Sequence, residues 1–529
     1  MTTFAGHSDA AALASQGSTR RPWLFLMILT VAATTDAINS TILVVARGHV
    51  MGGTHATPDE VAWLNMAYLA AKLTAFPAAV WLDQRIASGR LIVGSTAMLM
   101  ISSVGCAATS DLTALIAWRI IQGTAGAALL VSSQLVLFDV FPRCRQGIVQ
   151  AVFAFSTIMA PTTIAPALQG WIVDNASWSW IFVVNLPLGL CGLLVCRIMP
   201  IEDTTLSSSP PRRFDWIGVT LLAIAMTSIV FVTQEGSRYN WFDEPEIAEV
   251  SLLAGLAMIA FLAWQVVRQS RGALIDFAVF RDQHFSFGFI VSFVAGCALS
   301  GSAFVVPAFA TSVLDLSPTY AGLLLLPSGL MVCAGLLVAG ALIQLKDLDP
   351  TKTIPFGIIC FMTAMWMLAG SNSESGLPDM VPALLLRGLG LGLLFVSLTL
   401  VTLGGLDRRV LPQGIALFNI GRQIGGQIGI AWLTTYLDHQ NALNRTVLSQ
   451  YLAVGNRALA ERQEALGSLL AARGHEPEGA TQAATAFIQK AFAQQVATLS
   501  FNECFLAIGL LFVVATPILL IIRFALNRK

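Results

Sequence analysis

The sequence predicts an all-α, polytopic membrane protein with fourteen transmembrane helices. Hydrophobic residues make up 56% of its 529 residues, charged residues only 11%, and the mean hydropathy is +0.73. A soluble domain carries about 25% charged residues. This chain therefore has too few polar residues to cover its own surface, and we expect the excess apolar residues to face lipid. Long apolar runs and a biased distribution of Lys and Arg lead to the same fold class.

The apolar runs define the predicted spans. A helix needs about 20 apolar residues to cross the hydrocarbon core, and such runs recur along the chain with short polar segments between them. The first run is too long for a cleaved signal peptide. The predicted spans are 22–46, 61–82, 91–109, 112–138, 147–170, 179–199, 215–233, 247–267, 286–310, 319–343, 353–370, 379–404, 412–437 and 500–522.

Positive charges orient these spans. Lys and Arg concentrate in the cytoplasmic loops of membrane proteins. With the N-terminus inside, the inside segments hold nineteen of these residues and the short outside loops hold two, Arg47 and Arg238. The sequence therefore predicts cytoplasmic N- and C-termini, with residues 1–21 as a cytoplasmic tail. A long segment, 438–499, becomes an extracytoplasmic loop, and its stretch ALAERQEALGSLLAARG has an amphipathic helical pattern. Either a solvated helical hairpin or a docking surface for a partner fits this pattern.

Several function classes find no support in the sequence. It contains no GxxxxGK[ST] motif, and none of its five lysines follows a glycine, so we expect no ATP site. A net charge of zero gives no reason to expect a nucleic-acid partner. The cysteines and histidines lack metal-ligand spacing, and no nucleophile and base are paired, so we expect no metal, no cofactor and no enzyme. Uphill transport by this chain would have to draw on an ion gradient.

Six charged residues stand out within the apolar runs. A charge inside a span costs about 2.5–3.5 kcal/mol, so each one suggests a function. At about 1.5 Å per residue, Asp36, Lys72 and Arg119 lie at similar depths, so they meet if their helices touch. A carboxylate beside two cations can exchange its proton for an ion pair, although a static ion pair that fixes helix packing is the alternative. Glu503 lies near a predicted helix end, where an acid can reach the membrane surface. The six are Asp36, Lys72, Arg119, Arg387, Arg422 and Glu503.

The span 412–437 combines amides with glycines. Asn419, Gln423 and Gln427 recur every four residues, which predicts a polar face that lines a wet cavity. Small residues let helices approach closely. The glycines of this span therefore predict a second, smooth face for packing, formed by Gly421, Gly425, Gly426 and Gly429.

Several motifs carry a resemblance to a known family. The segment WSWIFVVNLPLG at 178–189 and the segment FDWIG at 214–218 resemble the openings of that family's sixth and seventh helices. Arg119, Gln122 and Gly123 match an R-x-x-Q-G motif implicated in proton coupling. The span from Gly414 to Gly429 resembles the family's helix 13. The chain is thus similar to the major facilitator superfamily, specifically to its fourteen-helix drug:proton antiporters of the EmrB/QacA type. The long outer segment favours the EmrB branch.

The chain departs from the family pattern at three places. The family's helix 1 aspartate is Asn39 here, and Asp36 lies three residues earlier on the same helical face. The inner-loop motif G-x-L-x-D-R-x-G-R survives only as VWLDQRIASGR, with Asp83 and Arg85. The fifth span keeps part of the antiporter motif G-P-x-x-G-G. The gating and packing residues that the resemblance implies are Asp83, Arg85, Gly123, Pro161, Ala165, Pro166, Gly170, Gly425, Gly426 and Gly429.

The resemblance implies a domain order. Residues 22–200 form an N-terminal six-helix bundle, 215–267 form two inserted linking helices, and 286–523 form a C-terminal six-helix bundle. The extracytoplasmic loop 438–499 lies between helices 13 and 14. Substrate is expected to bind near the midplane between the bundles, which alternate access by rocking.

The implied function is a proton-coupled antiporter of the cell inner membrane that exports lipophilic drugs or toxic small molecules. Its partners would be the lipid bilayer, the substrate, and a periplasmic adaptor with an outer-membrane channel. Four cations against two acids in the spans favour neutral or weakly acidic substrates. Alternatives are an exporter of an endogenous metabolite, lipid or siderophore, and a sensor or scaffold that transports nothing. Proton coupling is assigned to Asp36, Arg119 and Lys72, and the substrate cavity to Asn39, Gln122, Arg387, Asn419, Arg422, Gln423, Gln427 and Glu503.

Overall fold

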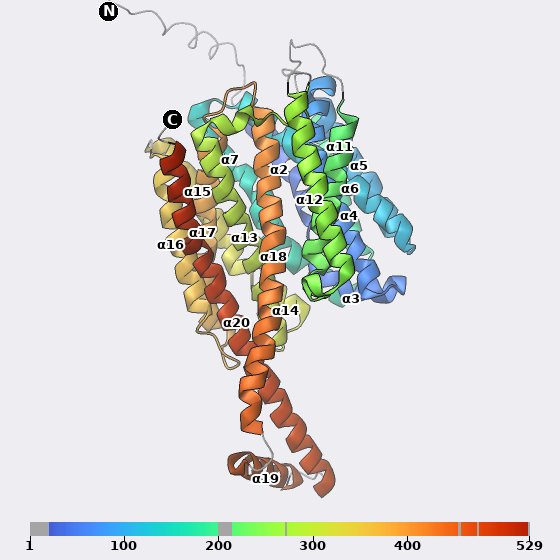
Figure 1. The fold of residues 1–529 in the computed structure, drawn as a ribbon, viewed down its shortest axis with the longest axis vertical. Coiled ribbons are helices and arrows are strands. Elements are labelled where there is room, and N and C mark those ends of the chain that lie inside the picture. The colour runs from blue at the N-terminus through green and yellow to red at the C-terminus, as the bar shows by residue number, and fades with distance from the viewer. Residues whose placement is uncertain are drawn as a thin grey trace, which may run out of the picture.

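The computed structural model describes residues 21–198, 214–269, 272–346, 348–452, 456–472 and 476–526. The described residues form helices that run roughly side by side (Figure 1). The helices are α2 (Arg21–Asn39), α3 (Ile42–Thr54), α4 (Pro58–Ile86), α5 (Ser88–Ala108), α6 (Leu112–Val140), α7 (Gln146–Ala154), α8 (Ala165–Asn175), α9 (Trp180–Val183), α10 (Asn185–Ile198), α11 (Trp216–Glu235), α12 (Pro245–Arg268), α13 (Gln283–Ser312), α14 (Pro318–Leu323), α15 (Leu326–Leu345), α16 (Pro350–Leu368), α17 (Leu377–Leu403), α18 (Leu411–Ser449), α19 (Arg457–Ala472) and α20 (Pro477–Leu526).

Helices occupy all fourteen ranges predicted as spans. Among the described residues, eleven helical segments are long and apolar enough to cross a membrane. The other three predicted spans fall on α4, α10 and α18. The described apolar stretch that includes α10 is shorter, and polar side chains lower the hydropathy of α4 and α18. The chain is a multi-pass membrane protein, and the number fourteen stays a prediction.

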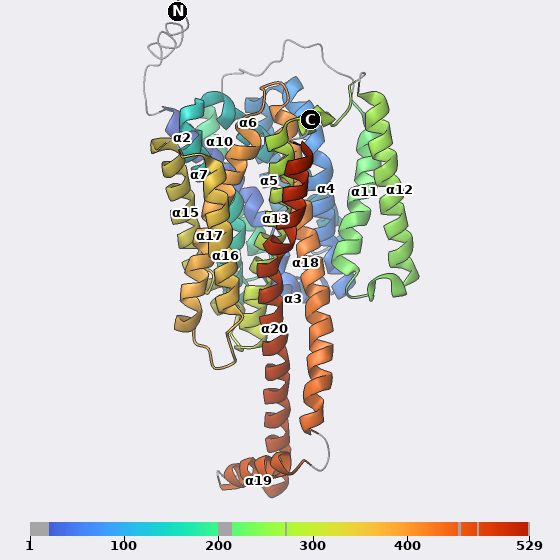
Figure 2. The ribbon, with the colours of Figure 1, turned by 60° about the vertical axis from the view of Figure 1, so that its left-hand side comes forward.

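Three terms describe the arrangement. We call α2–α10 the first half, α13–α20 the second half, and α11–α12 the linking hairpin. The end of the molecule at which α2 begins and α20 ends is called the inner end, after the predicted orientation, and the opposite end is the outer end (Figures 1 and 2).

The first predicted span, 22–46, is broken in the structure. α2 ends at Asn39 and α3 begins at Ile42. The hydroxyl of Ser40 donates to the carbonyl of Ala37 at 2.7 Å, and the hydroxyl of Thr41 donates to that of Ile38 at 3.3 Å. Such local side-chain bonds compete with continued helix. The break leaves the carbonyl end of α2 inside the protein, where other side chains can reach it.

The predicted span 147–170 is also irregular. Between α7 and α8 the residues Phe155–Ile164 adopt a π-helix that contains Pro161. Proline lacks the N–H that an α-helix needs and its ring crowds the preceding turn, and a wider helical turn is one way to accommodate it. The irregular stretch lies where this helix faces the second half.

The segment 438–499 continues the helices on either side of it. α18 runs without a break to Ser449, and α20 already begins at Pro477. The two helices project together from the outer end, and α19 lies across their tip (Figures 1 and 2). Lys490 forms a 2.8 Å ion pair with Asp315 at the base of this projection. The predicted span ends at 437 and 500 therefore mark no break in helical structure.

Glycines allow close contact between the two halves at both ends of the molecule, where α7 and α8 of the first half pack against α15 and α14 of the second half. At the inner end, a Cβ atom on Gly147 of α7 would lie 2.7 Å from the carbonyl oxygen of Gly340 of α15. At the outer end, a Cβ on Gly170 of α8 would lie 2.9 Å from the carbonyl oxygen of Pro318 of α14. Real Cβ atoms do not come this close, so only glycine permits this packing.

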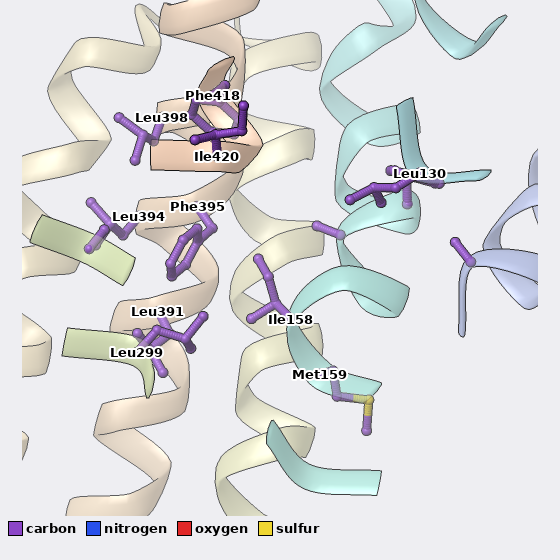
Figure 3. Close-up of a cluster of buried hydrophobic side chains, with 14 of the residues drawn as sticks. Leu130, Ile158, Met159, Leu299, Leu391, Leu394, Phe395, Leu398, Phe418 and Ile420 are labelled. Carbon is purple, nitrogen blue, oxygen red and sulfur yellow. The ribbon is translucent and has the colours of Figure 1, made fainter. Parts of the chain in front are cut away.

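Apolar side chains fill the space between these ends. Side chains of the first half face side chains of α13, α17 and α18 in a cluster of buried apolar residues (Figure 3). Its labelled members are Leu130, Ile158 and Met159 of the first half and Leu299, Leu391, Leu394, Phe395, Leu398, Phe418 and Ile420 of the second half.

Candidate functional site

A buried ion pair lies in the first half. The Nζ atom of Lys72 on α4 is 2.6 Å from Oδ2 of Asp36 on α2. The hydroxyl of Tyr68, one turn before Lys72, donates to Oδ1 of Asp36 at 2.6 Å and accepts a hydrogen bond from Lys72 at 3.2 Å. The three residues are at most 3% exposed. Both oxygens of the carboxylate are thus occupied, and the pair is shielded from solvent.

Two glycines of α6 make room for this network. A Cβ atom on Gly126 would collide with the carboxylate of Asp36, and one on Gly123 would collide with the carbonyl oxygen of Tyr68. α6 therefore lies against the backbone of α4 and against the side chain of Asp36 on α2. The glycine predicted at 123 as a packing residue lies at this contact.

Arg119 of α6 joins the network through Tyr68 and not through Asp36. Its guanidinium carbon lies 4.3 Å from the centre of the Tyr68 ring, a cation–π distance. Its Nη1 donates to the backbone carbonyl of Asn39 at 3.1 Å and to the side chain of Gln122 at 3.0 Å. Arg119 thus contacts the carbonyl end of α2, where the helix dipole is negative.

Other polar side chains meet at the same broken helix end. Asn185 of α10 donates to the side-chain oxygen of Asn39 at 2.8 Å, and Gln169 of α8 donates to the carbonyl of Ile38 at 3.1 Å. Arg119 has no carboxylate partner among the described residues.

The second half has its own buried cation. Arg387 of α17 is 1% exposed. It donates from Nε and Nη2 to the hydroxyl of Ser302 on α13 at 3.1 and 2.9 Å, and from Nη1 to Ser328 on α15 at 2.9 Å. In the described part of the chain it has no acidic partner. The contacts of Arg387 join three helices of one half.

A small cavity lies between the halves. Asn419 of α18 donates to the side-chain oxygen of Gln134 on α6 at 3.2 Å, which is a direct bond between the halves. Arg422 donates from Nη2 to Asn419 at 3.0 Å. Arg422 is the one charged residue among the cavity's lining, which is otherwise Gln134, Gln150, Phe153, Ala154, Thr157, Ile158, Thr399, Phe418 and Asn419.

Some predicted cavity residues lie elsewhere. Gln427 bonds to Gln234 of the linking hairpin at 3.3 Å. Glu503 lies in the interior of α20, 3.5 Å from the side-chain nitrogen of Asn444, at the base of the projection. Gln423 does not line the cavity between the halves. The amides of α18 therefore turn toward different neighbours instead of forming one wet face.

The predicted gating pair Asp83 and Arg85 is not brought together. Asp83 is buried, and its Oδ2 accepts a bond from the hydroxyl of Ser88 at 3.1 Å. The guanidinium of Arg85 lies 4.9 Å from the ring centre of Trp81. Of the predicted glycines of α18, Gly425 and Gly429 lie against the backbone of α13.

Sequence reasoning missed residues that complete these contacts. Tyr68 precedes Lys72 by one turn, and Gln134 and Gln150 are polar residues in apolar spans; each of these was a readable signal. Asn185 lies within the quoted 178–189 motif, but no role was assigned to it. Gln234 gave no sign, since a glutamine near a helix end is ordinary.

Comparison with known proteins agrees with this architecture. The described helices are those of a multi-pass membrane protein. The sequence profile described as Major Facilitator Superfamily matches residues 24–430. The chain belongs to the major facilitator superfamily.

Individual members of the superfamily are similar to this chain over most of its length. The chain is 27% identical to the multidrug export protein EmrB of Haemophilus influenzae over 430 residues, 81% of this chain and 83% of that protein. It is 23% identical to the fatty acid resistance protein FarB of Neisseria gonorrhoeae, over 94% of this chain and 95% of that one. A crystal structure of a bacterial homologue of the human lysosomal transporter Spinster, inward-facing and unoccupied, superposes with a TM-score of 0.55 at 14% identity, covering 97% of this chain and 99% of that one. This last likeness concerns the fold alone.

Proposed function

We propose that this protein is a proton-coupled antiporter that exports lipophilic small molecules by alternating access. The observation that carries the proposal is the buried pair of Asp36 and Lys72, 2.6 Å apart and closed off by Tyr68. An acid in this position can exist in two states, one bound to the cation and one bound to a proton. The two states differ in how α2 is held against α4.

The coupling follows from those two states. A proton that reaches Asp36 removes its charge, so the attraction to Lys72 is lost and α2 is freed from α4. When the proton leaves, the ion pair forms again. Arg119 holds the carbonyl end of α2 throughout, because it binds the backbone of Asn39 and not the carboxylate. Proton binding thereby changes helix contacts, which is what coupling to alternating access requires.

The cavity between the halves has room for little more than a water molecule, so substrate would enter only when the halves separate. The residues that line it favour lipophilic substrates without positive charge. Arg422 supplies a positive charge, Asn419, Gln134 and Gln150 supply amides, and Phe153 and Phe418 are among its aromatic lining. Among the described residues that line it there is no acid. A cationic drug would meet an uncompensated cation, whereas a weak acid would find a charge partner. The names of two relatives, a multidrug export protein and a fatty acid resistance protein, agree with lipophilic and weakly acidic substrates.

An exporter of one endogenous lipid or lipophilic acid is the second candidate. The relative named for fatty acid resistance favours it. The same cavity would serve both functions, and they differ only in the range of substrates accepted. We further propose an inner-membrane location with both termini in the cytoplasm, as the distribution of Lys and Arg predicts, and an adaptor that docks on the outer end.

Purified protein in sealed vesicles tests this proposal. A pH gradient is imposed, and uptake is followed for the anionic dye 8-anilinonaphthalene-1-sulfonate and for the cation ethidium. We expect gradient-driven uptake of the anion that a protonophore abolishes, little uptake of the cation, and loss of anion uptake in Asp36→Asn. Uptake that ignores the gradient would refute the coupling, and preferred uptake of ethidium would refute the substrate class.

A further inference from the structure

The linking hairpin lies across the seam between the two halves. α11 packs against α4 of the first half and also against α18 of the second half. α12 is mostly exposed and presents apolar side chains such as Leu256 and Ile259 outward, as a lipid-facing helix does. A hairpin that served only as a connection would need contacts to neither half.

One side chain joins both halves directly. The side-chain oxygen of Gln234 accepts a hydrogen bond from Asn65 of α4 at 3.3 Å. The side-chain nitrogen of the same residue donates to Gln427 of α18 at 3.3 Å. Gln234 is thus the middle member of a three-amide chain that runs from the first half to the second.

The turn that follows Gln234 also contacts both α4 and α18, nearer the outer end. Toward α4, Arg238 forms an ion pair with Asp59. Toward α18, the hydroxyl of Ser237 donates to Asp438 at 2.9 Å, and the indole nitrogen of Trp241 donates to Thr435 at 2.9 Å. These contacts lie toward the outer ends of α4 and α11 and, on α18, in the outer half of the predicted span 412–437 or just beyond it.

The turn adopts an unusual backbone to make these contacts. Asn240 and Trp241 have φ angles of 52° and 58°. A left-handed conformation is unfavourable for a bulky residue, so it persists only where surrounding contacts enforce it. Here it places the indole against Gly236 and in reach of Thr435.

We propose that the linking hairpin is a latch that holds the outer side of the transporter closed. Opening toward the outside requires the outer ends of α4 and α18 to separate, and Gln234 cannot then keep both partners. The three amides, the Arg238 ion pair and the Trp241 bond must break or change partners in that step. The hairpin therefore stabilises the outer-closed conformation and sets how often the outer side opens. This inference rests on the proposed alternating access.

Distances between spin labels test the latch. Labels are placed in a cysteine-free background at Gly52→Cys on α3, where an added side chain meets open space, and at His439→Cys, an exposed residue of α18. A long distance between the labels marks molecules whose outer side is open. We expect Gln234→Leu to increase the fraction of such molecules about fivefold or more, since two hydrogen bonds are lost. Trp241→Phe should shift it in the same direction by less.

Matched variants separate a latch from a general loss of stability. Thr220→Val on the exposed face of α11 should leave the distances unchanged. Gln427→Leu should shift them as Gln234→Leu does, and combining the two should add little, because both break the same chain. Unchanged distances in Gln234→Leu, or full additivity of the two variants, would overturn the proposal. The measurement needs neither substrate nor proton gradient, so its failure is distinct from a failure of transport.

Discussion

Lys72 Nζ lies 2.6 Å from Asp36 Oδ2, and the two side chains are only 3% and 5% exposed. A buried pair of this kind is costly to break by removing one partner, because the remaining charge has no water to solvate it. A proton on the acid also removes one charge, and we propose that this change is what the transport cycle uses. The following predictions test the role of each group around the pair.

Asp36→Asn should leave the protein in the membrane and reduce gradient-driven uptake at least 100-fold. The amide keeps the size of the side chain and cannot take up or release a proton. Lys72 then keeps an uncompensated charge, so thermal stability should fall, and Asp36→Asn combined with Lys72→Met should recover stability without recovering uptake. Uptake by Asp36→Asn at the parental rate would remove Asp36 from coupling.

Asn39→Asp should partly restore uptake to the Asp36→Asn variant. The backbone of Asn39 already contacts Arg119, and its side chain meets Asn185, so an acid at 39 would lie near a cation that lacks a carboxylate partner. The uptake rate of the double variant is the measurement, with Asn39→Leu in the same background as the control. Equal rates for the two would show that positions 36 and 39 are not equivalent.

Tyr68→Phe should slow uptake about tenfold while the protein stays folded. It removes the hydroxyl between Asp36 and Lys72 but keeps the ring under Arg119. One hydrogen bond to a charged group contributes about 1.5–3 kcal/mol. Tyr68→Leu, which also removes the ring, should lower thermal stability further. Uptake by Tyr68→Phe at the parental rate would show that the hydroxyl has no part in coupling.

Arg119→Ala should stop uptake more completely than Arg119→Lys. The guanidinium binds Leu64, Asn39 and Gln122 at once, whereas an ammonium is a point charge. Comparing the uptake rates of both variants at matched membrane levels decides the question. An equal loss in both variants would contradict this prediction and indicate a packing role for Arg119 instead.

The sequence revealed some of these relationships and hid others for physical reasons. Charge in an apolar run is readable, because burial of a charge is costly anywhere in a span; Asp36 and Lys72 were found that way. Helix periodicity could not show that α2 ends at Asn39, because Ser40 and Thr41 break the helix through hydroxyl bonds to its own carbonyls. Which amide of α18 faces which neighbour depends on helix rotation, and that is fixed by the glycine contacts with α13.

The projection formed by α18, α19 and α20 beyond the outer end should be dispensable for transport and needed for assembly. It exposes apolar side chains, among them Val447, Tyr451 and Phe487, that no described residue covers. Replacing 443–497 with a tight turn removes the tip. The shortened protein should keep uptake of the anionic dye in vesicles within about twofold and lose drug resistance in a cell with two membranes. As a control, Phe487→Ser and Tyr451→Ser together leave both helices in place and should reduce resistance through the surface alone. Full resistance in the shortened protein would show that no partner docks on the projection.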